Sequence, residues 1–141
     1  MNVFELLGPL PQTNSTTVLE ASAGTGKTFA LAGLVTRLVA EGAATLDQML
    51  LITFGRAASQ ELRERVRAQI VGALLALEDP ARADNDLLQH LVAEDQQARG
   101  QRLRDALAGF DAATIATTHQ FCQIVLKSLG VAGDSDSGVT L

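Results

Sequence analysis

Apolar residues recur along the chain with two patterns, and the first pattern predicts helices. Between residues 27 and 42 apolar positions lie three or four residues apart, and a second such stripe after Ala57 consists of Leu62, Val66, Ile70, Leu74 and Leu77. This spacing places apolar side chains along one face of a helix. Gly42 follows the first stripe and Pro80 the second, as is typical of helix ends. Two amphipathic helices are therefore predicted.

The second pattern consists of short, continuous runs of apolar or β-branched residues, and it predicts strands. The runs cover residues 16–19, 49–54 and 113–117. Runs of this length are typical of buried strands in a parallel sheet. The order strand, helix, strand predicts a right-handed crossover.

The region after the second helix is less regular. Residues 80–86 predict a loop, and residues 87–109 predict a helix that is broken near Gly100. After the third predicted strand, an apolar stripe predicts a helix that extends through Leu129.

The second predicted helix ends in an acidic pair that has a competing interpretation. Glu78 and Asp79 follow an apolar run, as do the carboxylates of a strand that holds Mg²⁺ and a catalytic water. The run continues the helical stripe without a break, and Pro80 ends it as a helix ends. A helix is therefore predicted here.

Composition narrows the class of protein. The chain has 141 residues, 47% of them hydrophobic, and a mean hydropathy of +0.17, which favours a globular domain with a core. No run is long enough to span a membrane, and the N-terminus lacks the basic start of a secretory signal, so a cytoplasmic location is expected. The single cysteine, Cys122, excludes an intrachain disulfide and is expected to be a small buried residue.

The charge balance argues against a broadly basic nucleic-acid binder. The formal net charge is −5 and the pI is near 4.9, whereas binding of many phosphates requires clustered Lys and Arg. Arg56, Arg63, Arg65 and Arg67 nevertheless lie close together around one predicted helix. A solvated face is the commoner role for such arginines, but a local groove could still hold a nucleic-acid backbone.

The stretch between the first predicted strand and the first helix has the residues of a triphosphate cradle. It reads Glu20-Ala21-Ser22-Ala23-Gly24-Thr25-Gly26-Lys27-Thr28. Gly24 and Gly26 allow backbone N–H groups to approach phosphates, and the helix that starts at Lys27 points its positive end at the same anion. Lys27 offers an ammonium to the β and γ phosphates, and Thr28 offers a hydroxyl to a bridging Mg²⁺. We therefore predict an ATP or GTP site at residues 21–28.

The flanking elements support this nucleotide site. Ala21 stands where the strict motif has glycine, but its side chain is still small. A glycine-rich turn with a chance lysine is the alternative, and the strand before and the helix after the loop argue against it. The predicted fold class is α/β, with a P-loop NTPase (RecA-like) parallel sheet flanked by helices.

The ends of the second and third predicted strands carry further candidate residues. Ligands of such sheets lie beyond the carboxyl ends of the strands, where Thr53 and Phe54 end one run and Thr118 and His119 follow the other. A hydroxyl there can hold a backbone phosphate, and an aromatic ring can stack on a base. Core packing is an equally good interpretation of Phe54, and a lone histidine often has no special role.

Three stretches, in this order, resemble the first motifs of the UvrD-type superfamily 1 DNA helicases. They are EASAGTGKT, LLITFGRAASQELRERVR and ATIATTHQFCQIVL, at residues 20–28, 50–67 and 113–126. Within this family, the residues of these stretches are most similar to those of the helicase and nuclease subunits of bacterial exodeoxyribonuclease V. The resemblance implies a motor domain that couples ATP hydrolysis to translocation along single-stranded DNA in double-strand-break repair, together with the other subunits of such a complex.

The resemblance also implies roles for individual residues. Lys27 and Thr28 would be the catalytic residues, because they would offset the negative charge of the triphosphate. Thr28 would act as a Mg²⁺ ligand. The residues that fall in DNA-contacting motifs are Thr53, Phe54, Arg56, Thr118 and His119. Gly55 stands where the family more often has a polar residue and Thr118 where an apolar one is usual, which weakens the DNA assignment locally but not the ATP assignment.

Several parts that the family needs are not found in this sequence. They are an Asp-Glu strand, a coupling glutamine, the arginines of a second motor domain and a nuclease domain. We therefore expect an N-terminal piece of a longer enzyme, an incomplete motor domain that hydrolyses ATP poorly or not at all by itself. Its predicted divisions are a lead-in at 1–15, the N-terminal part of a UvrD-like ATP-binding domain at 16–130 and a linker-like tail at 131–141.

Two other functions remain open from the sequence. A stand-alone P-loop module would bind a nucleotide or a partner subunit without catalysis, and the missing acidic strand favours it. A P-loop kinase or GTPase is less well supported, because no guanine-reading loop or acceptor site is recognisable.

Overall fold

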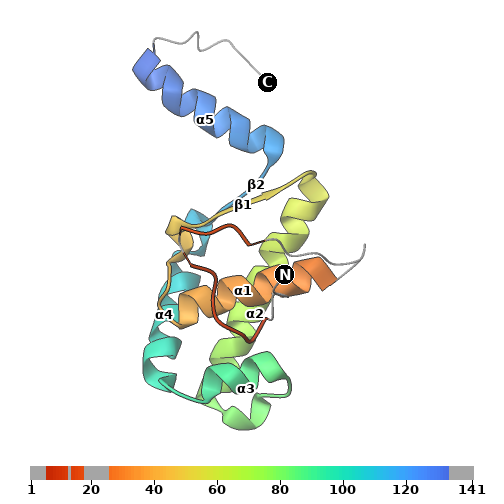
Figure 1. Ribbon diagram of the computed structural model, residues 1–141, viewed down its shortest axis with the longest axis vertical. Coiled ribbons are helices and arrows are strands. Elements are labelled where there is room, and N and C mark those ends of the chain that lie inside the picture. The colour runs from red at the N-terminus through yellow and green to blue at the C-terminus, as the bar shows by residue number, and fades with distance from the viewer. Residues whose placement is uncertain (1–5, 13, 18–25, 134–141) are drawn as a thin grey trace.

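The computed structural model describes residues 6–12, 14–17 and 26–133. Within them the fold is mixed α/β (Figure 1). The helices are α1 (Gly26–Ala40), α2 (Arg56–Glu78), α3 (Asp86–Val92), α4 (Gln96–Ala108) and α5 (Thr118–Gly133), and the strands are β1 (Leu50–Thr53) and β2 (Thr114–Thr117). None of the described helices has both the length and the apolar character needed to cross a membrane.

Strands β1 and β2 form a two-stranded parallel sheet. Leu50 pairs with Thr114 at one end, and Thr53 pairs with Thr117 at the other. Parallel strands require a long connection, and α2, α3 and α4 supply it here. Both strands were predicted, and their bounds are confirmed to within one residue.

The first predicted strand, at 16–19, is not confirmed. Thr16 and Thr17 lie in exposed, irregular backbone and pair with neither strand of the described sheet. A β-branched residue forms a strand only where a neighbouring strand completes its hydrogen bonds. Val18 and Leu19 lie outside the described residues.

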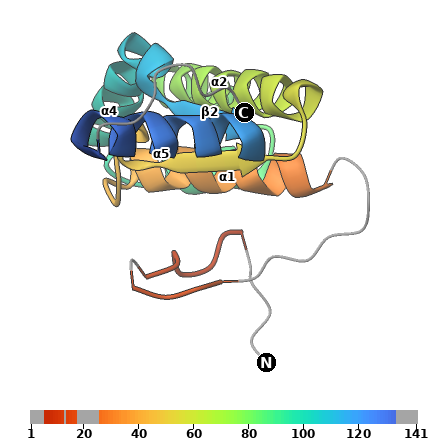
Figure 2. The same ribbon diagram turned by 90° about the horizontal axis from the view of Figure 1, so that it is seen from above.

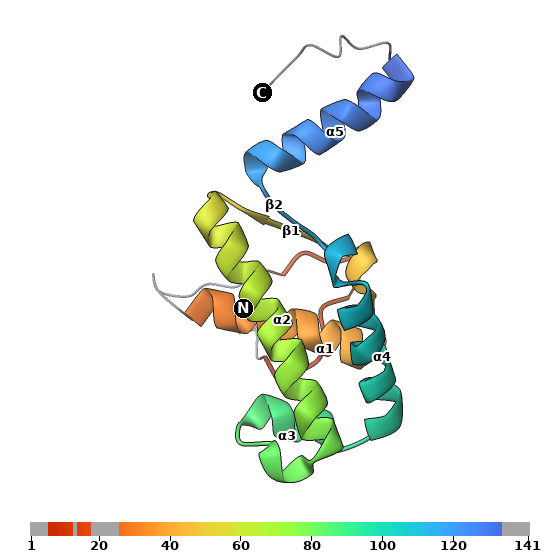
Figure 3. The same cartoon turned by 180° about the vertical axis from the view of Figure 1, so that it is seen from behind.

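Helix α2 lies at the centre of the core. It crosses α1 and packs against α3 and α4, as Figure 3 shows. The predicted stripe is confirmed, because each of its members is buried: Leu62, Val66, Ile70, Leu74 and Leu77. Full burial of one such side chain contributes about 1.5–3 kcal/mol. The helix continues without a break through Glu78, so the alternative of an acidic strand at this point is excluded.

The end of α1 is also as predicted. Gly42 has a φ of +79°, its N–H donates to the Val39 carbonyl at 3.1 Å, and the Ala43 N–H donates to the Leu38 carbonyl at 2.9 Å. These two bonds form a Schellman motif, which needs a residue in the left-handed region. Gly42 therefore ends the helix by its backbone conformation.

The predicted break near Gly100 is wrong in its position. Gly100 lies buried inside α4, and the chain turns earlier, between Val92 and Gln96. Asp95 adopts a left-handed conformation there, with a φ of 48°. A glycine lowers the stability of a helix without breaking it, whereas a left-handed residue ends the helical backbone.

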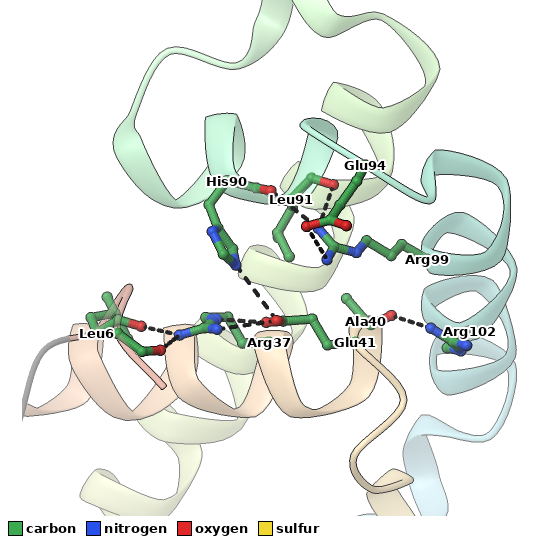
Figure 4. Close-up of polar contacts among 10 residues, drawn as sticks. Leu6, Arg37, Ala40, Glu41, His90, Leu91, Glu94, Arg99 and Arg102 are labelled. Carbon is green, nitrogen blue, oxygen red and sulfur yellow. Dashed lines mark hydrogen bonds and ion pairs between the residues drawn. The ribbon is translucent and has the colours of Figure 1, made fainter. Parts of the chain in front are cut away.

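A buried arginine ties the N-terminal segment to the helices (Figure 4). Arg37 of α1 donates to the carbonyl oxygens of Leu6 at 2.6 Å and Gly8 at 2.7 Å, and it pairs with Glu41 at 2.6 Å. His90 of α3 faces the same carboxylate, with 3.6 Å between its Nε2 and Glu41 Oε1. Three segments that are distant in sequence therefore meet at one ion pair.

Glu41 stays ionised more readily than an ordinary glutamate. Burial by itself raises its pKa, but the hydrogen bond from Arg37 and the charges of Arg37, His90 and Arg99 together lower the pKa below its usual value. Arg99 of α4 also donates to the carbonyls of His90 at 3.1 Å and Leu91 at 3.0 Å, and thereby binds the C-terminal end of α3.

Candidate nucleotide and nucleic-acid site

The start of α1 contains the described part of the predicted phosphate cradle. Gly26 opens the helix, Lys27 is exposed and Thr28 is half-buried. The first turn holds no acidic residue, so its unpaired N–H groups and positive dipole end face no competing carboxylate from that turn. The remaining cradle residues, Ala21, Ser22, Ala23, Gly24 and Thr25, lie outside the described residues.

The carboxyl end of β1 lies toward the same end of the molecule as the start of α1 (Figures 1 and 2). Thr53 and Thr117 are partners at the ends of the two strands. The residues that follow them, Phe54 and Thr118, therefore leave the same edge of the sheet. This common edge brings the two predicted DNA-contacting motifs together.

At this edge, Phe54 is the most exposed of the large apolar residues that the structure describes. Its exposed fraction is 98%, so it does not pack in the described core. Arg56, at the start of α2, is also exposed. The Thr53 hydroxyl is already engaged, because it contacts the Ser59 hydroxyl and donates to the Gly55 carbonyl at 3.3 Å. Thr53 thus holds the loop from which Phe54 and Arg56 project.

A capping box at the start of α5 was not predicted. The Thr117 hydroxyl accepts from the Gln120 N–H at 3.1 Å, and Gln120 Oε1 accepts from the Thr117 N–H at 2.9 Å. The spacing Thr-x-x-Gln is the sequence signal that could have indicated it. The cap sets the direction in which α5 leaves β2, with Thr118 and His119 exposed in its first turn.

Helix α5 extends away from the other helices (Figure 1) and has its main contacts with the two strands. Cys122 is exposed on this helix, so the prediction of a buried cysteine is wrong. The reason is the position of the whole helix, because its apolar stripe faces no other described element along most of its length. Leu126 and Leu129 are exposed as well.

Known proteins with similar sequences place the chain in a family. The model of the UvrD/REP helicase N-terminal domain matches residues 5–140. The RecBCD enzyme subunit RecB of Mycolicibacterium smegmatis is 86% identical over 141 residues, which are 100% of this chain and 13% of that protein. RecB of Mycobacterium tuberculosis is 68% identical over 144 residues, again 100% of this chain and 13% of the relative.

A more distant relative has a different name. An ATP-dependent helicase/nuclease subunit from Latilactobacillus sakei is 32% identical over 119 residues, which are 84% of this chain and 11% of that protein. The chain thus spans 13% of the length of the RecB relatives named above. The family model covers nearly all of the chain, including all three motif stretches, so the resemblance inferred from them is confirmed. The chain belongs to the UvrD/REP helicase N-terminal domain family, and its sequence is that of a RecB-like N-terminal part.

Proposed function

We propose that the chain is the ATP-binding part of a RecB-like, ATP-dependent DNA helicase and nuclease subunit. The subunit translocates on single-stranded DNA in double-strand-break repair, in the cytoplasm and with other subunits of a RecBCD-like complex. The observation that carries the proposal is the acid-free first turn of α1, which holds Lys27 and Thr28 and lies toward the same side of the molecule as the carboxyl end of β1. The name of the Latilactobacillus relative adds the dependence on ATP.

The nucleotide is held by a P-loop at residues 21–28. The small residues of the loop let backbone N–H groups reach the phosphates, and Lys27 adds a positive charge at the β and γ positions. Thr28 holds Mg²⁺ through its hydroxyl, and the ion when bound neutralises charge on the phosphates. The P-loop fold of RecA-like type, with further strands beside β1 and β2, is part of this proposal.

DNA is held at the common edge of β1 and β2. Phe54 stacks on a base, Arg56 contacts a backbone phosphate, and His119 lies in the second motif. Thr118 offers its exposed hydroxyl beside this path, and Thr53 holds the loop that carries Phe54 through its contacts with Gly55 and Ser59. Because the carboxyl end of β1 and the start of α1 lie toward the same side of the molecule, a change in the bound nucleotide acts on the side that holds the DNA.

The test is binding of a non-hydrolysable ATP analogue with Mg²⁺, measured by calorimetry on the 141-residue chain. We expect Lys27→Ala to weaken binding at least tenfold, since the lysine is the charge nearest to the terminal phosphates. Arg67→Ala removes one exposed positive charge from α2 and is the matched control, with unchanged binding. Circular dichroism establishes that each variant is folded. Equal affinity of Lys27→Ala and wild type, or no binding by the folded wild type, contradicts the proposal.

A further inference from the structure

A groove lies between α2 and α5 and follows β2. It consists of two adjoining cavities of about 320 and 500 Å³, which share Arg63, Ile115 and Gln120 in their walls. Helix α2 adds Arg56 to one wall, and α5 adds Lys127 to the other. This α2–α5 groove begins beside the common edge of the strands and extends away from it.

The groove is positively charged in a chain that is negative overall. Its walls carry Arg56, Arg63 and Lys127, against Asp111 as the one acidic residue of the lining. None of the three cations has an ion-pair partner within the described part of the chain. Arg67, Arg102 and Arg104 also lack a carboxylate partner there, so the groove is distinguished by the gathering of three such cations around two adjoining cavities. Cations that gather in a groove without partners favour an anionic ligand.

Arg63 has two long contacts within the protein. Its Nη2 donates to the Ala113 carbonyl at 3.5 Å, and its guanidinium lies 5.8 Å from the centre of the Phe110 ring. A guanidinium has five N–H donors, so these contacts leave donors for a phosphate.

The spacing of the charges indicates an extended ligand. Arg56 and Arg63 are two turns apart on α2, roughly 10 Å along the helix axis, and Lys127 lies on the opposite wall. One phosphate cannot reach all three, whereas a chain of phosphates can. At the edge, the exposed Phe54 precedes Arg56 by two residues, so a strand whose base stacks on Phe54 has its backbone at the start of the groove.

We propose that the α2–α5 groove binds the sugar-phosphate backbone of single-stranded DNA as it leaves the edge of the sheet. Arg63 and Lys127 contact successive parts of that backbone. This inference rests on the proposed function, which brings the strand to Phe54 and Arg56. It adds a path, a defined contact for Arg63 of the second motif stretch, and a further residue, Lys127, which follows the third stretch.

The experiment measures binding of fluorescent oligo(dT) of about 20 nucleotides to the 141-residue chain at several salt concentrations. Each phosphate contact on a single strand contributes about 0.7 to the slope of log K against log salt. We expect Lys127→Gln to lower this slope by about 0.7 and to weaken binding roughly five- to tenfold at 50 mM salt. Lys127→Arg keeps the charge and is expected to keep the slope. Arg67→Gln, which removes a charge from α2 outside the groove, is the matched control with an unchanged slope.

Arg63→Gln is the second variant, with an expected loss of the same size. Circular dichroism checks whether Arg63→Gln is folded. If it is not, the test rests on Lys127→Gln, because Lys127 is exposed and its replacement does not disturb the core. An unchanged slope in Lys127→Gln, or an equal loss in Arg67→Gln, overturns the groove and leaves the proposed function standing. No binding of oligo(dT) by the wild type overturns the groove and the proposed DNA site together. The nucleotide site is tested separately, by the binding of the ATP analogue to Lys27→Ala.

Discussion

Arg37 shows how much one side chain organises in this protein. The residue is 3% exposed, and its guanidinium binds two carbonyl oxygens of the N-terminal segment as well as the carboxylate of Glu41. Removal of one partner from a buried ion pair leaves a charge and several acceptors without compensation. The stability of the N-terminal segment therefore depends on an α1 residue far from it in sequence.

We expect Arg37→Met to lower the free energy of unfolding by about 3–5 kcal/mol. The matched control is Arg65→Met, because Arg65 also pairs with a glutamate four residues away on a helix but is 44% exposed. That pair contributes at most about 1 kcal/mol. Urea unfolding followed by circular dichroism measures both. If both variants lost the same free energy of unfolding, the burial of the Arg37–Glu41 pair would contribute nothing to stability.

The lowered pKa of Glu41 predicts a dependence of stability on pH. Because the folded-state pKa lies below the unfolded value, the ionised carboxylate stabilises the fold above the usual glutamate pKa of 4.5. This contribution is lost as the pH falls through the folded-state pKa. We expect the wild type to lose more stability than Glu41→Gln between about pH 6 and pH 3 in urea unfolding. Parallel curves for the two proteins would contradict the role of this carboxylate.

At the scale of elements, the sequence pattern predicts correctly those features that neighbouring residues determine. The α2 stripe, the Gly42 end of α1 and both described strands follow from spacing and residue type. The break at Asp95 does not, because several polar residues there are compatible with either conformation. The burial of Arg37, the exposure of Cys122 and the charge of the α2–α5 groove depend on contacts between distant segments, which periodicity does not report. For the candidate site, the sequence predicts Lys27, Thr28 and Phe54 as functional residues, whereas Lys127 becomes a candidate only because the fold brings it to the same cavity as Arg63.

Two glycines test the difference between a helix end and a helix interior. At Gly42 an added methyl group would meet the Arg102 guanidinium at 3.0 Å, and the φ of +79° disfavours any side chain. We expect Gly42→Ala to destabilise the protein by about 1–2 kcal/mol. Gly72, inside α2, has open space where a methyl group would lie, so Gly72→Ala is expected to stabilise by about 0.5–1 kcal/mol. Thermal unfolding distinguishes them, and shifts of the same sign would contradict this account.

At the scale of the whole molecule, the apolar surface is unevenly distributed. Buried side chains gather around α2, whereas α5 exposes Ile124, Leu126 and Leu129, and β1 exposes Leu50 and Ile52. Single exposed apolar side chains are common on globular domains, but α5 exposes several within two turns. Among the described residues, the helices around α2 are thus well packed, whereas α5 has much of its apolar surface exposed.

We expect the double variant Leu126→Gln, Leu129→Gln to reduce binding of the dye anilinonaphthalene sulfonate, since it removes exposed apolar surface. Its free energy of unfolding should change by less than about 0.5 kcal/mol, because surface positions contribute little. Leu103→Ala, which opens a cavity at a buried position, is the opposite case and should cost about 2–5 kcal/mol. Dye fluorescence and urea unfolding provide the two measurements. A large loss of stability in the double variant would show that α5 is packed after all.

The parallel pairing of β1 with β2 imposes an order on folding during synthesis. On the ribosome, α1 and α2 emerge early and can dock as soon as both are made, because they are neighbours in sequence. The partner of Leu50 is Thr114, so the sheet cannot close until α3 and α4 have also been translated. Until then β1 presents unpaired backbone to the cell. The edge that is proposed to hold DNA therefore forms only after α3, α4 and β2 have been made, and among the described elements only α5 is made later.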